Sequence, residues 1–138
     1  MRPLLPPDYL PTAKESFMNS MQLEYFRQKL ERWREELLME SNETIQHLQE
    51  DSPQEPDIAD RASLETDRAL ELRTRDRERK LITKIDEALE RIENKSYGFC
   101  EETNEPISLR RLEARPIAIL SIEAQERHER MEKTHRDD

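Results

Sequence analysis

Residues 19–37 read NSMQLEYFRQKLERWREEL, and most of the architecture follows from the spacing of the large apolar side chains in this stretch. They recur three and four residues apart, at Leu23, Phe26, Leu30, Trp33 and Leu37. This spacing places them along one side of an α-helix as a narrow stripe, which is buried only when it packs against another helix. Ile45 and Leu48 extend the stripe beyond a gap at Glu40 and Ser41. We therefore predict a long helix that begins at the start of this stretch.

Two prolines end this helix, and a second helix follows them. Pro53 and Pro56 have no backbone N–H and would break a helix interior. Asp57 is a suitable N-cap for the next helix, and Asp60 would lie in its first turn. A second apolar stripe with the same spacing runs toward the end of that helix, near Asn94. Its residues are Ile82, Ile85, Leu89 and Ile92.

The simplest assembly of two long helices joined by a short turn is an antiparallel hairpin. We predict a mainly α-helical fold in which a coiled-coil hairpin spans residues 19–95 and has its tip near residues 51–60. A helix of about thirty residues would extend roughly 45 Å, at about 1.5 Å per residue. The two apolar stripes would face each other along the hairpin.

The two ends of the chain are predicted to form a small head. Residues 1–18 contain four prolines, which favour an extended segment that packs with the head. Within this segment Thr12 and Glu15 have the spacing of a capping box, which indicates a short helix. Gly98 is expected to terminate the second long helix, and residues 96–138 would form the rest of the head.

The predicted head needs a packed interior and ends in a helix. Its candidate core residues are Phe99, Ile107, Leu109, Leu112, Ile117, Ile119, Leu120 and Ile122. A C-terminal helix is predicted from Ser121 to about Lys133, and we expect it to pack on the base of the hairpin.

The composition excludes several classes of protein. Charged residues make up 40% of the chain and hydrophobic residues 33%, so narrow seams between helices are expected rather than a wide apolar core. The net charge of −9 argues against direct DNA binding, which gains most of its affinity by neutralising phosphates. The single cysteine, Cys100, excludes an intramolecular disulfide. No apolar run is long enough for a membrane span or a secretory signal, which predicts a cytoplasmic protein.

The sequence contains no recognisable catalytic or metal-binding motif. Glycine-rich phosphate loops, nucleophile elbows and paired His–acid motifs are all missing from it. Cys100, His128 and His135 do not make up the four ligands at defined spacing that structural zinc normally needs. We therefore expect a protein that is not an enzyme.

Two carboxylates are predicted at the tip of the hairpin, Asp57 and Asp60, beside the small side chain of Ala62. Acidic residues at a helix N-terminus are stabilising by about 0.3–1 kcal/mol, and this structural role is sufficient to explain them. Their location also suits a functional role, because a narrow hairpin could carry negative charge into a pore. The residues alone leave both interpretations open.

Four cations are predicted to lie on one side of the second long helix. This basic stripe consists of Arg73, Arg77, Lys80 and Lys84, spaced four, three and four residues apart. It could be a solvated face neutralised by the pairs Glu71–Arg75 and Asp76–Lys80. It could equally hold a polyphosphate or an acidic partner surface. The spacing does not distinguish these alternatives.

Several motifs resemble those of the DksA/TraR family of bacterial transcription factors. DIADRA at residues 57–62, ELRTRDRERKLI at residues 71–82 and LRRLEARP at residues 109–116 occur in the order found in that family. The first long helix also fits, at Phe26, Leu30, Trp33 and Arg34. The likeness extends over about residues 19–125.

The resemblance implies that the chain regulates transcription initiation. Members of this family bind RNA polymerase at its secondary channel, where the hairpin tip approaches the active centre. They destabilise open promoter complexes, inhibiting ribosomal RNA promoters and activating some biosynthetic ones. The matching tip residues are Asp57, Asp60 and Ala62.

The resemblance also implies an effector, the alarmone ppGpp, which binds between the factor and polymerase rather than to the factor alone. The factor's side of that pocket matches Arg77, Leu81, Lys84 and Arg115. Two of these residues, Arg77 and Lys84, belong to the basic stripe. Gln125 stands where the family often has lysine, which is a departure at the expected effector site.

A second departure concerns zinc. Family members with zinc carry Cys-x-x-Cys twice in the head, and three of those four thiols are missing at the matching positions. These positions are Cys100, Thr103, Ser121 and Ala124. We therefore expect a degenerate zinc-finger-like head without zinc, held by packing and insensitive to zinc shortage and peroxide.

Long paired helices also occur in two other classes of protein. A Gre-type factor, which stimulates transcript cleavage by polymerase, carries a β-rich C-terminal domain, and the residues after the hairpin are too few and too helical for one. A structural coiled-coil scaffold would dimerise through its seams. The proline-marked turn and the polar middle of the second helix argue against a scaffold, because a long dimer needs an unbroken apolar stripe. A monomer is expected.

Overall fold

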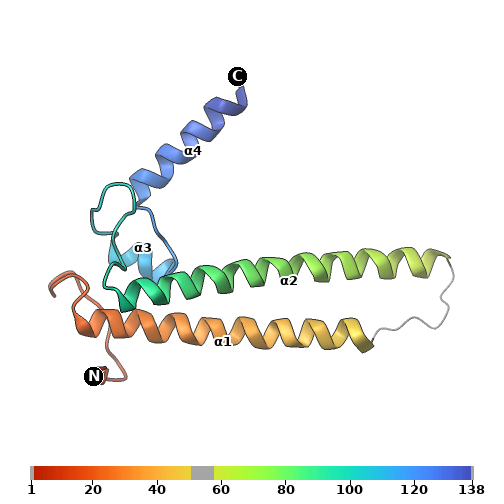
Figure 1. The fold of residues 1–138 in the computed structure, drawn as a ribbon, viewed down its shortest axis with the longest axis horizontal. Coiled ribbons are helices and arrows are strands. Elements are labelled where there is room, and N and C mark those ends of the chain that lie inside the picture. Colours follow the sequence, from red (N-terminus) through yellow and green to blue (C-terminus); the bar gives the residue numbers. More distant parts are fainter. Residues whose placement is uncertain (1, 51–57, 138) are drawn as a thin grey trace. The chain divides into compact units, whose positions relative to one another are not determined.

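The computed structural model describes the backbone of residues 2–50 and 58–137, and the side chains of these ranges except 48–50, 58–60 and 136–137. The described residues form helices and no strand. The helices are α1 Ser20–Glu50, α2 Ile58–Glu93, α3 Leu109–Ala114 and α4 Ile122–Asp137 (Figure 1). The prediction of a mainly α-helical fold is confirmed.

The chain divides into two compact units. We define the head as Met1–Leu30 together with Glu87–Asp138, and the helix pair as Glu31–Asp86. Both α1 and α2 contribute residues to each unit. The segments 1–18, 19–95 and 96–138 stay a sequence-based prediction, and the tip near residues 51–60 lies largely outside the described residues.

The helix pair is antiparallel. Arg34 on α1 pairs with Asp86 on α2, with 2.7 Å between Nε and Oδ1. His47, further along α1, pairs with Glu71, with 2.7 Å between Nδ1 and Oε1. The later residue of α1 pairs with the earlier residue of α2. The two helices therefore run in opposite directions, as predicted for the hairpin (Figure 1).

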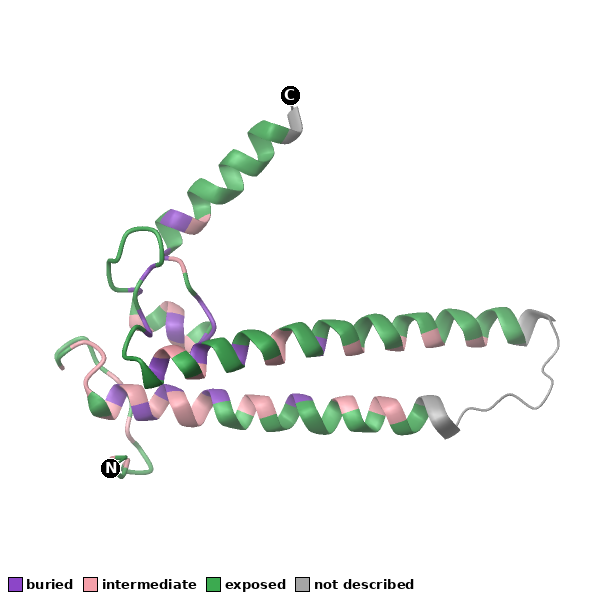
Figure 2. Cartoon of the chain, in the orientation of Figure 1, coloured by how far each residue is buried: buried purple, intermediate pink, exposed green. Residues whose placement is uncertain are grey.

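The seam of the helix pair is narrow, as the low apolar content requires. Leu37 and Ile85 are buried, whereas most other positions of the pair are exposed (Figure 2). The gap that interrupts the apolar stripe at Glu40 and Ser41 has a counterpart on α2. There the buried position is taken by Glu78, whose side chain is only 7% exposed.

Glu78 introduces a carboxylate into this seam without a compensating partner. Its Oε2 atom is buried and has no hydrogen-bond partner among the described residues. Burial raises the pKa of this carboxyl above its ordinary value, and the negative charge of Glu40 raises it further. An ionised carboxylate in this position destabilises the helix pair.

The core of the head joins the ends of the two long helices to the segments that follow α2. Its buried apolar residues are Phe26, Leu30, Ala88, Ile92, Tyr97, Cys100, Ile107, Leu112, Ile117, Ala118 and Ala124. The rings of Phe26 and Tyr97 are in contact, with centroids 5.6 Å apart. The Tyr97 hydroxyl donates a buried hydrogen bond of 2.7 Å to the carbonyl of Pro116. This tyrosine was not among the predicted core residues.

Three of the predicted core residues are instead exposed. Phe99, Ile119 and Ile122 are 37%, 37% and 46% exposed. Gly98 has a φ of +92° and turns the backbone so that Tyr97, rather than Phe99, faces inward. Of the others, Ile107, Leu112 and Ile117 are buried as predicted, and Leu109 and Leu120 are half-buried.

The end of α2 also differs from the prediction. Lys95, not Gly98, takes the left-handed conformation that terminates the helix, with a φ of 65°. The N–H groups of Ser96 and Tyr97 then both donate to the carbonyl of Arg91, at 2.9 and 3.2 Å. Glycine is favoured at position 98 because a φ of +92° strains other residues, and a Cβ there would also lie 3.0 Å from Cγ of the Met18 side chain.

The helix predicted near Thr12 is only a turn, closed by a hydrogen bond of 3.2 Å from the Glu15 N–H to the Thr12 carbonyl. Further along, Met18 has a φ of 52°, which a right-handed helix does not allow. The first long helix begins at Ser20, where the Asn19 side chain caps it by accepting the Gln22 N–H at 2.8 Å.

Helix α4 is longer than predicted and does not pack on the base of the hairpin. Its side chains from Glu126 to His135 are exposed, because this segment has no continuous apolar stripe. Ser121 precedes the helix as its cap and accepts a hydrogen bond of 3.2 Å from the Ala124 N–H. Among the described residues, no helix is both long and apolar enough to cross a membrane.

Replacing Glu78 by glutamine is expected to stabilise the helix pair at neutral pH by about 1 kcal/mol, since it removes an unpartnered buried charge. In the wild type the raised pKa makes stability greatest at low pH and lowers it as pH rises through that pKa. The variant should lose this part of the pH dependence. Urea unfolding followed by circular dichroism between acidic and neutral pH measures both effects. Glu43→Gln, at an exposed carboxylate of the same unit, is the matched control; equal behaviour of the two variants would contradict the prediction.

Candidate functional site

The predicted tip residues are only partly described. Asp57 lies outside the described residues. Asp60 belongs to the first turn of α2, but its side chain is not described. Ala62 is exposed. The functional interpretation of the two carboxylates therefore stays a prediction.

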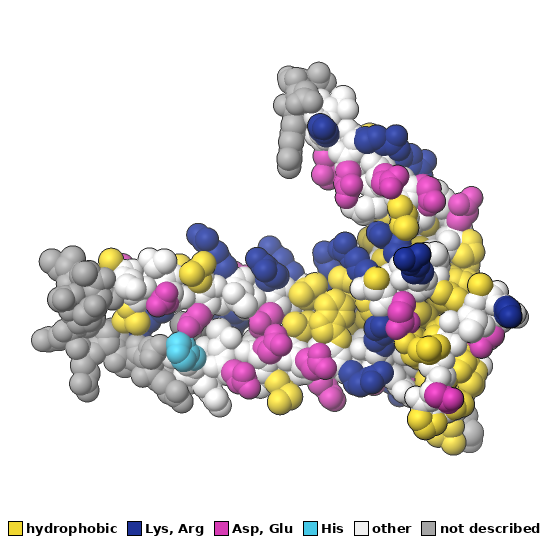
Figure 3. All heavy atoms as spheres, turned by 180° about the vertical axis from the view of Figure 1, so that it is seen from behind, with side chains coloured by type: hydrophobic (Ala, Val, Ile, Leu, Met, Phe, Trp, Pro, Cys, Tyr) yellow, Lys and Arg dark blue, Asp and Glu magenta, His cyan; other side chains and the backbone are white. Residues whose placement is uncertain are grey.

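The basic stripe lies in the helix pair and is exposed along its length. Figure 3 shows Lys and Arg side chains gathered along α2 on one face of this unit. The stripe residues Arg73, Arg77, Lys80 and Lys84 are all exposed. Leu81, which the family resemblance adds to them, is half-buried between the stripe and the seam.

The cations of the stripe are not neutralised by neighbouring carboxylates. Among the described residues, none of the four forms an ion pair, and neither Glu71–Arg75 nor Asp76–Lys80 is formed. Glu71 pairs across the seam with His47 instead. The interpretation of the stripe as a self-neutralised face is therefore wrong for these pairs. Four uncompensated cations on one helix face favour an anionic ligand or surface.

Arg115 belongs to the head, whereas Arg77, Leu81 and Lys84 belong to the helix pair. It follows α3 directly and is exposed. Its N–H donates to the carbonyl of Arg111 at 2.7 Å, and its carbonyl accepts the Ala118 N–H at 3.0 Å. The backbone of Arg115 is thus held on both sides while its guanidinium stays accessible.

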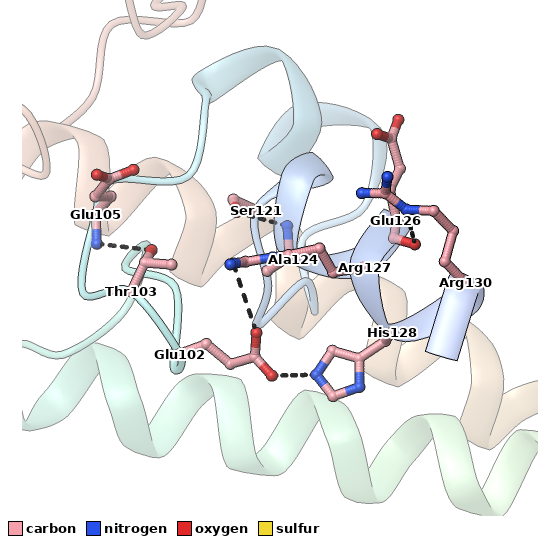
Figure 4. Close-up of polar contacts among 9 residues, drawn as sticks. All are labelled: Glu102, Thr103, Glu105, Ser121, Ala124, Glu126, Arg127, His128 and Arg130. Atoms are coloured by element: carbon pink, nitrogen blue, oxygen red, sulfur yellow. Dashed lines mark hydrogen bonds and ion pairs between the residues drawn. The ribbon is translucent and has the colours of Figure 1, made fainter. Parts of the chain in front are cut away.

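The fold brings together the four positions that match the zinc ligands of the family. The Thr103 side chain and the Ser121 backbone both form hydrogen bonds with the sulfur of Cys100. Ser121 in turn bonds to the N–H of Ala124, as Figure 4 shows. Cys100 and Ala124 are fully buried. The backbone therefore brings the four positions of the family's zinc site together, but the side chains at these positions are not a full set of zinc ligands.

The side chains at these positions do not fit a structural zinc ion. They supply one thiol, two hydroxyls and one methyl group, whereas structural zinc takes four Cys or His ligands. Within residues 2–50 and 58–137, no group of three or more His, Cys, Asp or Glu side chains is placed to hold a metal. Cys100 acts here as a hydrogen-bond acceptor.

The hydrogen bonds at Cys100 change its acidity. Burial raises the pKa of the thiol, but donors from Thr103, Ser121 and Glu102 together outweigh burial and lower the pKa to about 6. At neutral pH the group is therefore a thiolate. Hydrogen-bond donors stabilise the negative charge of a thiolate, as a metal cation does when a thiolate is its ligand. Here the peptide dipoles would provide that stabilisation.

A charge cluster links the same loop to α4. Glu102 contacts both Arg127 and His128 on the helix, and its Oε2 lies 3.8 Å from Nη2 of the arginine (Figure 4). Glu102 comes two residues after Cys100, so this clamp fastens the first turns of α4 to the loop that carries the thiol. Neither the clamp nor the thiol's hydrogen bonds could be foreseen from residue spacing.

Comparison with known proteins identifies relatives along nearly the whole chain. Residues 22–92 match the family described as DnaK suppressor protein DksA, N-terminal domain, and residues 95–130 match the prokaryotic dksA/traR C4-type zinc finger. The chain is 67% identical over 131 residues to the RNA polymerase-binding transcription factor DksA of Caulobacter vibrioides, covering 95% of this chain and 92% of that protein.

Two further relatives extend this comparison. The RNA polymerase-binding transcription factor DksA of Escherichia coli K12 is 48% identical over 109 residues, which cover 79% of this chain and 72% of that one. The solved structure of transcription factor DksA2 from Pseudomonas aeruginosa is similar in fold, with a TM-score of 0.80 and 45% identity. The match covers 89% of this chain and 93% of that chain.

The acidity of Cys100 can be measured by titrating the ultraviolet absorbance of its thiolate, with Cys100→Ser as the blank. We expect a midpoint of about 6, well below the ordinary value of 9.0. Because the pKa is lowered by folding, the stability gained from this group is complete above the ordinary value and is lost as pH falls through about 6. Thr103→Val should raise the midpoint, whereas Thr134→Val on α4 should not. An unshifted wild-type midpoint would contradict the assignment.

Proposed function

Because this chain belongs to the DksA/TraR family, we propose that it binds RNA polymerase and regulates transcription as a protein factor rather than as an enzyme. The observation that carries the proposal is its 67% identity, over 95% of its length, to a transcription factor named for binding RNA polymerase. Such a factor would work in the cytoplasm. The net charge of −9 suits contact with polymerase better than direct contact with DNA.

The proposed mode of action uses the secondary channel of polymerase. The antiparallel helix pair is narrow, because its seam is only one apolar stripe wide on each helix. Asp57, which directly precedes α2 in the sequence, and Asp60, in its first turn, would enter the channel together with the small Ala62. Carboxylates near an active centre that holds Mg²⁺ and nucleic-acid phosphates would act electrostatically there, destabilising open complexes.

The proposed effector is ppGpp, held where the factor meets polymerase. Arg77 and Lys84 of the basic stripe are exposed cations without ion-pair partners among the described residues, and Arg and Lys are the usual ligands of phosphate groups. Leu81 and Arg115 would complete the factor's side of the site. Solvent and salt screen exposed cations, so the factor alone should bind ppGpp weakly. Inhibition of ribosomal RNA promoters and activation of some biosynthetic promoters would follow.

The alternative functions have less support. Past α2, the described residues contain α3, α4 and an isolated β-bridge between Phe99 and Pro106, unlike the β-rich domain of a Gre-type factor. A dimeric scaffold would need free apolar seams. Here Leu37 and Ile85 are already buried within one chain, which favours a monomer.

We also propose that the head folds without zinc. Ala124 offers no ligand atom, and the Cys100 sulfur, the Ser121 cap and the Glu102 clamp supply local connections in its place. Although the lowered pKa of Cys100 favours its oxidation, the sulfur is fully buried and the chain has no second cysteine to pair with. This head would therefore also resist mild oxidation better than a four-cysteine site.

The polymerase proposal is tested by transcription in vitro from a ribosomal RNA promoter with the cognate polymerase, with and without ppGpp. We expect the wild type to inhibit, and ppGpp to increase the inhibition. Asp60→Asn should bind polymerase with unchanged affinity but lose most of the inhibition, because it removes the tip charge and keeps the shape. Asp67→Asn, at an exposed carboxylate further along α2, is the control. A wild type that does not bind polymerase would refute the proposal, and full inhibition by Asp60→Asn would refute the role of the tip.

The zinc proposal is tested by measuring the metal content and thermal stability of protein purified without added metal. We expect far less than one zinc per chain, with no change in Tm or activity after treatment with a chelator. A variant with Thr103→Cys, Ser121→Cys and Ala124→Cys should bind zinc, because the four positions converge. One zinc per wild-type chain, together with a lower Tm after chelation, would show that the proposal is wrong.

A further inference from the structure

Arg115 stands between two anchored residues in the head. Glu113, two positions before it, is fixed to α1, and Pro116, directly after it, is fixed by Tyr97. Between these anchors the Arg115 backbone makes its own hydrogen bonds through both N–H and carbonyl groups. Only the exposed guanidinium is free to respond to a ligand.

The first anchor is a carboxylate shared by two side chains of α1. Tyr25 Oη donates to Glu113 Oε1 at 2.5 Å, and Lys29 Nζ donates to the same oxygen at 2.7 Å. The lysine also lies over the tyrosine ring, 6.0 Å from its centroid. Burial opposes ionisation of Glu113, but the hydrogen bonds from Lys29 and Tyr25 outweigh it and lower the pKa, so the carboxylate is charged at neutral pH.

The second anchor is buried. Tyr97 is fully buried, and its hydroxyl donates to the Pro116 carbonyl at 2.7 Å. Because this bond is shielded from water, it restrains the backbone more strongly than an exposed one. Because Tyr97 is fully buried, its effect on a bound ligand has to pass through the backbone that it holds.

We propose that Tyr25 and Lys29, acting through Glu113, and Tyr97, acting through Pro116, are positioning residues that pre-organise Arg115 for an anionic ligand. The inference rests on the proposed function, in which that ligand is ppGpp at the polymerase interface. Pre-organisation raises affinity because less conformational freedom is lost when the ligand binds. The anchors should therefore affect the response to ppGpp and leave ppGpp-independent contact with polymerase unchanged.

The test compares variants that remove a single hydrogen-bonding group at nearly constant shape: Tyr25→Phe, Glu113→Gln and Tyr97→Phe. For each, the ppGpp concentration that gives half of the maximal increase in inhibition is measured with the full chain and polymerase. We expect this concentration to rise about three- to tenfold. Polymerase binding and inhibition without ppGpp should stay at the wild-type level.

Tyr9→Phe is the matched control. It removes a hydrogen bond of the same kind in the same unit, 2.6 Å from the Tyr9 hydroxyl to Glu15, which involves neither Glu113 nor Pro116. It also keeps the ring that packs against Tyr25, with centroids 6.1 Å apart. Its response to ppGpp should be that of the wild type. Hydrogen exchange at the Arg115 and Ala118 amides provides an independent readout: the anchor variants should accelerate exchange there, and the control should not.

Coupling to Arg115 distinguishes positioning from a general loss of structure. In an Arg115→Ala background, Tyr25→Phe should cause no further change in the response to ppGpp, because the group that it positions is gone. If Arg115→Ala has a wild-type response, both the proposed role of Arg115 and this inference are wrong. If Arg115→Ala weakens the response but the anchor variants behave like Tyr9→Phe, only this inference is overturned.

Discussion

Two narrow apolar stripes, one on α1 and one on α2, provide the packing on which the rest of the molecule depends. With 33% hydrophobic residues, the chain can cover such stripes but cannot fill a broad interior. Pairing two long helices is therefore an economical way to bury them, and it leaves most of each helix surface exposed. That surface allows one side of α2 to carry the basic stripe, whose cations form no ion pair within the part of the chain that the structure describes. Because the seam is narrow, every position in it matters for the stability of the helix pair. The buried carboxylate of Glu78 therefore destabilises the pair locally.

The head has to hold short non-helical segments together, and we propose that it does so without a metal. Its sulfur atom has changed role: at Cys100 it accepts hydrogen bonds from the loops that a metal ion would otherwise connect. A serine cap organises the start of α4, and the Glu102 clamp attaches that start to the neighbouring loop. Each of these contacts is local and individually modest in energy. Together they hold close to one another the four positions that match the family's zinc ligands.

The long helices could be predicted because helical periodicity is a property of neighbouring residues. The spacing of Leu30 and Leu37 identifies a seam, and Asn19 and Ser121 lie where helix caps are found. Periodicity ends where the helices end, and there the predictions were wrong. Phe99 was expected inside and is 37% exposed, since backbone turns in the head decide which side chains face inward.

The candidate site, too, could be predicted only in part from the sequence. Spacing alone grouped Arg73, Arg77, Lys80 and Lys84, but it could not tell whether neighbouring carboxylates neutralise them, because the same helix face permits pairing and non-pairing rotamers. The link from Tyr25 to Glu113 was invisible in the sequence, since it joins residues 88 positions apart. Asp57 and Asp60 remain sequence-based predictions.

That separation of 88 positions also bears on how the molecule is made. The helix pair joins segments that follow one another closely in the sequence, so their pairing can begin early. The head cannot, because its interior combines the first thirty residues with those after Glu87. A ribosome must therefore have synthesised most of the chain before Glu113 can meet α1. Until then the apolar residues at the beginning of α1 lack their packing partners, so the earliest part of the chain is among the last to be folded.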